Sequence, residues 1–239
     1  MTQIIERNGN KVLLITKGDL DEDNFYIGDV DVSAAQFDGS IEIVANLGLV
    51  RFKASVSARL SLTAKAGSGI EAGSGIKAGS GIKAGEGIEA GRGIKAGLGI
   101  EAGSGIKAGS GIKAGSGIKA GEGIKAGEGI EAGRGIKAGE GIEAGRGIKA
   151  GWGIEAGWGI KAGSGIEAGW GIEAGLSIAA KWISTPLRIF AGLCIWRIPT
   201  VDEKQIRAEI HSGEIAHGTV VLPEKASDAE VDRTITKGG

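Results

Sequence analysis

A six-residue unit, Ala-Gly-x-Gly-Ile-(Lys/Glu), runs without slippage from Ala66 to Ile178. Nineteen isoleucines fall on every sixth position between Ile70 and Ile178, whereas the residue x changes from unit to unit. Any fold for this tract must therefore give an apolar side chain the same environment once in every six residues. About half of the chain is repeat, so a repeat architecture is favoured over a single compact core.

The spacing of the glycines excludes several regular structures. Two glycines per unit would cost a helix about 2 kcal/mol per unit relative to alanine. Collagen needs glycine at every third position. A disordered tract gives no reason for the regular isoleucine, and no proline interrupts the repeat.

An extended chain fits the unit better. Side chains alternate between the two sides of a strand, so Ile and Ala point to one side and Lys or Glu to the other. The Gly-x-Gly segment then forms a corner, where we expect the glycines to supply positive φ. Stacked coils would bury a ladder of isoleucines, each contributing about 1.5–3 kcal/mol, and leave x on the outside.

The repeat resembles the hexapeptide-repeat β-solenoids, in which each coil has three six-residue sides. That resemblance implies an all-β, single-stranded β-solenoid (β-helix). The left-handed acyltransferases of this kind have a small residue two positions before the aliphatic one, and this chain departs from that pattern. The corresponding positions here include Ser74, Glu86, Arg92, Leu98 and Trp152.

The charges that follow each isoleucine favour one coil length. Like charges stacked about 4.8 Å apart repel. With three units per coil, 9 of the 15 stacked pairs between Glu71 and Glu173 are opposite in sign, whereas with two units per coil only 5 of 16 are. A triangular 18-residue coil is therefore favoured over a flat, two-sided 12-residue coil.

Segments before the repeat indicate how it begins. The stretch from Val50 to Ala66 keeps apolar residues at even positions and joins the repeat in phase, so it indicates irregular first coils. Three upstream runs have the composition of strands: residues 11–16, 25–32 and 40–45. We expect a β-rich N-terminal cap over residues 1–49 and a solenoid over residues 50–180.

Segments after the repeat indicate how it ends. Ser184 stands at the next isoleucine position, and Pro186 follows. Thr200 and Glu203 form a capping box that predicts a short helix, and EIAHGTVVLP predicts a strand. We expect a small α+β C-terminal cap or oligomerisation region over residues 181–223, with Ile206 and Ile210 on one helix face, and a flexible tail over residues 224–239.

Composition excludes several functions. The chain has 28 basic and 29 acidic residues, a balance that argues against broad binding of nucleic acid. Cys194 is the single cysteine, so no intrachain disulfide can form and a reducing compartment is expected. The N-terminus has no secretory signal pattern, and no apolar run approaches about 18 residues. The sequence therefore predicts a cytoplasmic protein that does not contact a membrane.

Few residues suggest catalysis or metal binding. His211 and His217 flank Glu214, but the spacing is not that of a zinc motif. The run Asp19, Asp21, Asp23 begins like a calcium loop and lacks its later ligands, so an acidic turn is favoured. Cys194 lies among apolar residues and is expected to be buried. We expect no catalytic, metal or cofactor site, and hence no enzyme.

The trend in residue x carries the main functional signal. Early corners are mostly Ser, middle ones Glu or Arg, and late ones Trp, a series that Trp182 is expected to continue. With three units per coil, Trp152 and Trp170 would stack with Arg134 one coil back; with two, Trp170 would stack between Trp158 and Trp182. The tryptophans either pack under the cap or along a subunit contact, or anchor a partner surface. The candidate partner-binding residues are Trp152, Trp158, Trp170, Trp182, Arg134 and Arg146.

These observations favour a rigid, non-enzymatic protein-binding rod, either monomeric or assembled into a homo-oligomer through its C-terminal region. The chain as a whole is similar to phage or mobile-element proteins, so an inhibitor of a host protein is one version of this hypothesis. Two alternatives stay open: a trimeric virion or fibre component, and an acyltransferase-like enzyme.

Overall fold

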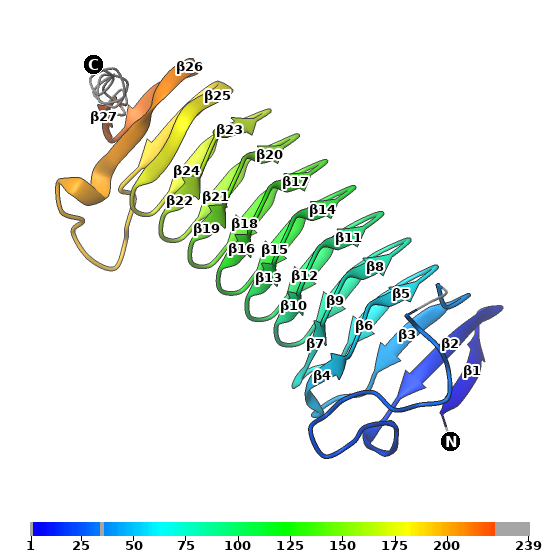
Figure 1. Ribbon diagram of the computed structural model, residues 1–239. Helices are drawn as coiled ribbons and strands as arrows, with labels where there is room; N and C mark the ends of the chain where they lie inside the picture. The colour runs from blue at the N-terminus through cyan, green and yellow to red at the C-terminus, as the bar shows by residue number, and fades with distance from the viewer. Residues whose placement is uncertain (1, 34–35, 223–239) are drawn as a thin grey trace, which may run out of the picture.

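The computed structural model describes residues 2–33 and 36–222 and is an all-β, single-stranded solenoid (Figure 1). In the regular region each coil contributes three short strands, and each strand pairs in parallel with the third strand after it, as Ile88 of β10 does with Ile106 of β13. The predicted fold class and the triangular 18-residue coil are confirmed, and the 12-residue coil is wrong.

The strands stack into three faces. Face A consists of β5 Val56–Ala58, β8 Ile76–Ala78, β11 Ile94–Ala96, β14 Ile112–Ala114, β17 Ile130–Ala132, β20 Ile148–Ala150 and β23 Gly165–Ala168. Face B consists of β4 Gly48–Phe52, β7 Ser68–Ala72, β10 Ile88–Ala90, β13 Ile106–Ala108, β16 Ile124–Ala126, β19 Ile142–Ala144 and β22 Ile160–Ala162. Face C consists of β3 Ser40–Ile43, β6 Leu62–Ala64, β9 Ile82–Ala84, β12 Ile100–Ala102, β15 Ile118–Ala120, β18 Ile136–Ala138, β21 Ile154–Ala156 and β24 Ile172–Ala174.

The core is a thin column of isoleucine and alanine between the three faces. The repeat isoleucines are at most 1% exposed, and the alanines two residues later are also buried from Ala72 to Ala174. The Lys or Glu between them points outward, as strand alternation requires. The predicted division into inside and outside residues is therefore correct.

The role expected for the repeat glycines is wrong in one respect. Within the repeat only Gly67, in the first unit, has a positive φ; the other positive-φ glycines lie outside the repeat, at Gly9, Gly48, Gly192, Gly213 and Gly218. The first glycine of each unit is required because its α-carbon packs against a backbone carbonyl of the preceding coil, as Gly115 does against Gly97. Close stacking of coils explains this glycine, whereas turn conformation does not.

The N-terminal residues cover the first coil. Strands β1 Gln3–Arg7 and β2 Asn10–Ile15 form an antiparallel hairpin, and β2 pairs in parallel with β3 of face C. A 3-10 turn, Lys17–Asp19, follows β2. The strand expected over 25–32 does not form: this segment makes only isolated bridges, including Phe25 with Arg51, and runs as a loop beside β4.

The C-terminal coils are irregular. Strand β25, Ile178–Ala191, runs through all three faces, because Ile178, Ile183 and Ile189 pair with residues of β22, β23 and β24 in turn. Ile183, and not Ser184, fills the next inward position, so this coil is one residue shorter than the regular ones.

The helix predicted after Thr200 is absent. A single 3-10 turn, Asp202–Lys204, leads into β26, Gln205–His217, which pairs with β25 and places Ile206 and Ile210 on two different faces. Strand β27, Thr219–Val221, then pairs with the start of β26. The tail expected over 224–239 lies outside the described residues. Within the described part of the chain, no helix has the length and apolar character needed to cross a bilayer.

Candidate interaction surface

A stacked aromatic ladder lies on the corner between faces A and C. Trp170 stacks on Trp152 with ring centroids 5.2 Å apart and planes 6° from parallel. The guanidinium carbon of Arg134 lies 5.2 Å from the Trp152 ring centroid on the next coil back. The 18-residue coil predicts this order, and the structure confirms the geometry.

The backbone fixes the spacing of this ladder. The N–H of Trp170 donates to the carbonyl of Trp152, and the N–H of Trp152 donates to that of Arg134, both at 3.2 Å. The Thr185 hydroxyl donates to the carbonyl of Trp170. Trp152 and Trp170 are 44% and 56% exposed, so their stacked edges form an ordered apolar strip on the surface.

Trp158 occupies a different corner, between faces B and C, and is 47% exposed. Leu176 lies on the following coil, where its backbone N–H donates to the carbonyl of Trp158 (2.9 Å). The two corners with tryptophan therefore border the same face, face C, at its C-terminal end. Faces A and B each have tryptophan at one repeat corner only.

Trp182 does not continue the corner series, contrary to expectation. Because the last coil is one residue short, Trp182 pairs with Gly165, and its ring lies against that glycine. The ring also stacks on His211, with centroids 5.3 Å apart and planes 4° from parallel. This partly buried tryptophan packs the C-terminal coils together.

Arg146 lies on the third corner, between faces A and B, where its guanidinium is 3.7 Å from the Glu128 carboxylate. The six candidate residues therefore do not form one site. Arg134, Trp152 and Trp170 are together, Trp158 is across face C from them, and Arg146 and Trp182 lie elsewhere.

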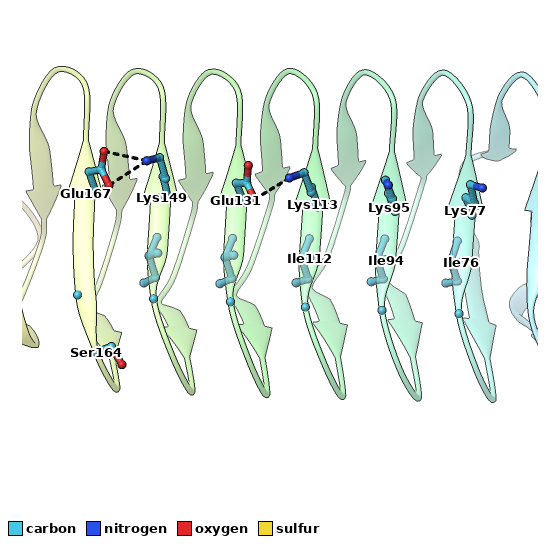
Figure 2. A pocket seen from close by; sticks show the side chains of 18 of the residues that line it. Ile76, Lys77, Ile94, Lys95, Ile112, Lys113, Glu131, Lys149, Ser164 and Glu167 are labelled. Atoms are coloured by element: carbon cyan, nitrogen blue, oxygen red, sulfur yellow. Dashed lines mark hydrogen bonds and ion pairs between the residues drawn. The ribbon is translucent and has the colours of Figure 1, made fainter.

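Each face also carries a shallow groove along the rod. The groove on face A has a volume of about 840 Å³ and is lined by the glycine, isoleucine and charged residue of successive coils, with Trp182 at its end. Figure 2 shows this groove, in which Lys113 pairs with Glu131 (2.8 Å) and Lys149 with Glu167 (2.9 Å). Similar grooves follow faces B and C. Because all three faces have one, the grooves are a consequence of the repeat and do not mark a specific site.

The loop from Gly192 to Lys204 exposes apolar side chains, and the sequence predicted this segment only as part of the C-terminal cap or oligomerisation region. It leaves face C at the same corner as Trp158 and projects from the end of the rod (Figure 1). Ile195 and Ile198 are 94% and 88% exposed. Arg197 donates two hydrogen bonds to Glu203, and Glu203 also accepts the backbone N–H of Thr200 (2.9 Å). The Arg197 guanidinium, and then the Thr200 N–H, lower the pKa of Glu203 to about 2.

The residues considered for metal binding have local structural roles. The Nδ1 of His217 donates to the carbonyl of Ala191 (2.6 Å). Asp21 accepts the backbone N–H groups of Asp23 and Phe25, which makes an acidic turn. Over residues 2–33 and 36–222, no group of three or more His, Cys, Asp or Glu side chains is arranged to hold a metal ion. Cys194, expected to be buried, is only partly so.

Comparison with protein-family models, with curated proteins and with solved structures finds no match to this chain.

Proposed function

We propose that this protein is a non-enzymatic, rigid rod that binds another protein through the aromatic corner formed by Arg134, Trp152 and Trp170. The observation that carries the proposal is the exposed, parallel stack of Trp152 and Trp170. Tryptophan and arginine are the side chains most often found at binding hot spots. A stack already ordered by its own backbone loses little conformational freedom on binding.

The rest of the surface favours protein binding over catalysis. The grooves are lined by glycine, isoleucine and Lys or Glu side chains, many of them ion-paired. Inhibition of a host protein by a phage-encoded rod is one form that such binding would take. In that case the bound protein would lose its own activity when the rod is added.

The test compares the immobilised protein with two variants in capture of proteins from a bacterial lysate. Trp152→Ala with Trp170→Ala removes the stack. Leu98→Ala is the matched control, because Leu98 is 58% exposed on the same corner, three coils earlier than Trp152.

Proteins retained by the parent and by Leu98→Ala should be lost from the double variant. Loss of a hot spot of about 2 kcal/mol or more corresponds to binding about 30-fold weaker, measurable by calorimetry with the purified partner. If all three proteins retain the same set with equal affinity, the aromatic corner is not the binding surface.

A further inference from the structure

Face C carries two outward charges that form no ion pair with any residue that the structure describes. Along β9, β12, β15, β18, β21 and β24, the outward residues are Lys83, Glu101, Lys119, Lys137, Glu155 and Glu173. Lys83 pairs with Glu101 (3.3 Å) and Lys137 with Glu155 (2.5 Å). Among the described residues, Lys119 and Glu173 have no oppositely charged side chain within ion-pair distance.

These two charges are placed symmetrically. The strands β15, β18, β21 and β24 are consecutive and in register, so Lys119 and Glu173 lie equally far from the midpoint between β18 and β21. Each is one and a half coils from it, or about 7 Å, at a coil spacing of about 4.8 Å. The four outward charges from Lys119 to Glu173 run positive, positive, negative, negative. If a second set is laid beside them in the opposite direction, each lysine therefore meets a glutamate.

A second copy that packs antiparallel against face C gives both Lys119 and Glu173 an oppositely charged partner. With a twofold axis at that midpoint, Lys119 faces Glu173 of the partner subunit, and Lys137 faces the partner's Glu155. A twofold contact repeats each pair on both sides of the axis. The same operation brings Arg134 opposite Trp152 of the partner subunit, a pairing of the kind that Arg134 and Trp152 already form within one chain.

The other two faces lack this combination. On face A, Lys77 and Lys95 have the same sign, and the alternating charges from Lys113 to Glu167 are already paired within the chain. On face B, Glu71 pairs with Arg51 (3.0 Å), and Lys107 pairs with Glu89 (2.7 Å). Face C is also the face bordered by tryptophan at both repeat corners, with Trp152 and Trp170 on one side and Trp158 on the other.

We propose that the protein forms an antiparallel homodimer across face C, centred between β18 and β21. A face about 20 Å wide, in contact over six coils, buries about 600 Å² per copy, near the low end for specific interfaces. The dimer therefore dissociates on dilution. The proposal goes beyond the proposed function, because it assigns a second copy of this chain to face C.

Charge reversal distinguishes this register from other contacts. Glu173→Lys puts a lysine beside Glu155 on the neighbouring coil, and Lys119→Glu puts a carboxylate between Glu101 and Lys137. Neither change creates a net repulsion within one chain, so each variant should fold and melt like the parent. Each single variant places like charges opposite each other in the dimer, at two symmetry-related positions.

The measurement is sedimentation equilibrium of the full chain over a range of concentrations. The parent should show a monomer–dimer equilibrium, and each single variant should dimerise about tenfold more weakly. The double variant, Lys119→Glu with Glu173→Lys, restores opposite charges and should return the dissociation constant to within about threefold of the parent's. Lys95→Glu on face A is the control and should leave the dissociation constant of the dimer unchanged.

A parent that stays monomeric, or that sediments as a trimer, overturns the proposal. So does a double variant no better than the singles, because the register would then be wrong. The charge variants leave the tryptophans intact. A failed dimer together with loss of captured protein in the Trp152→Ala, Trp170→Ala variant therefore refutes the dimer alone and leaves the proposed function standing.

Discussion

Gly115 lies directly against the carbonyl oxygen of Gly97 in the preceding coil. A Cβ built on Gly115 would come closer than 3.0 Å to that oxygen, a separation that real Cβ atoms do not show. The second glycine of the same unit, Gly117, has more room, because its Cβ would be 3.3 Å from the carbonyl oxygen of Gly135. The two glycines of the repeat are therefore constrained differently, the first by coil stacking and the second only weakly.

Alanine substitution should separate the two glycines. Gly115→Ala forces neighbouring coils apart and should lower the free energy of unfolding by about 3 kcal/mol, within the range seen for overpacked sites. Gly117→Ala should cost about 1 kcal/mol or less, since the carbonyl need move only slightly. Chemical denaturation of the two variants measures the difference, and equal losses would contradict the stacking explanation.

Substitution inside and outside one coil tests the core. Ile124 is 1% exposed, so Ile124→Asp buries an unpaired carboxylate and should lower the free energy of unfolding by about 4 kcal/mol or more. Glu122, two residues earlier, is an exposed corner residue. Glu122→Lys should change the free energy of unfolding by about 0.5 kcal/mol or less. Circular dichroism during thermal unfolding compares the two variants. Similar melting temperatures would refute the inward placement of the isoleucine ladder.

The periodic features of this fold could be predicted from the sequence. An isoleucine at every sixth residue requires one repeating environment, and the signs of the charges distinguish three units per coil from two. Once the coil length is known, the stack of Trp152 on Trp170 follows by counting. The predictions that succeeded depend on residues whose environment is the same in every coil.

The features that could not be predicted depend on breaks in the period or on distances between coils. One missing residue between Ile178 and Ile183 moves Trp182 off the corner, and the pairing that shows this is a tertiary one. Thr200 and Glu203 do exchange the hydrogen bonds of a capping box. The chain nevertheless continues as β26, because the open edge of β25 offers backbone partners at intervals from Ile178 to Phe190.

The ion pairs of Glu42 make the N-terminal end sensitive to acid. Its carboxylate contacts Arg7 (2.8 Å) on β1 and Lys65 (2.5 Å) after β6, and its side chain is only 12% exposed. Lys65, and then Arg7, hold the pKa of Glu42 below its usual value of 4.5. A lowered pKa in the folded state stabilises the fold above about pH 4.5, and this contribution is lost as the pH falls below that value.

Glu42→Gln should therefore lower the free energy of unfolding by about 1 kcal/mol at pH 7. The difference from the parent should shrink as the pH falls below 4.5, because the Glu42 carboxyl group is then protonated in the unfolded state and, at lower pH, in the folded state too. The control is Glu71→Gln, which removes a more exposed pair with Arg51 and should have a smaller effect at pH 7. A difference for Glu42→Gln that stays constant from pH 7 into the acid range would show that the ion pairs do not contribute.

The ion pair of Arg197 with Glu203 should hold the loop from Gly192 to Lys204 in its observed conformation and so limit access to Cys194. Cys194, the only cysteine, lies in this loop and is partly buried, so its alkylation rate reports on the loop without further engineering. Glu203→Gln removes the doubly hydrogen-bonded ion pair and should raise the alkylation rate at pH 7 by about fivefold. Glu209→Gln, on the neighbouring strand, is the control and should leave the rate unchanged.

The same pair predicts how the loop responds to acid. Because the pKa of Glu203 is lowered to about 2 from 4.5, its contribution to loop closure is fully present above about pH 4.5 and is lost as the pH falls through about 2. Carbon-detected NMR of the Glu203 carboxyl group should therefore give a midpoint near 2 in the parent. In Arg197→Gln, which lacks the first cause of the shift, the midpoint should rise toward 4.5. A parent midpoint near 4.5 would mean that the ion pair does not persist in solution, and the loop would then have no polar contact of this kind to hold its apolar residues in place.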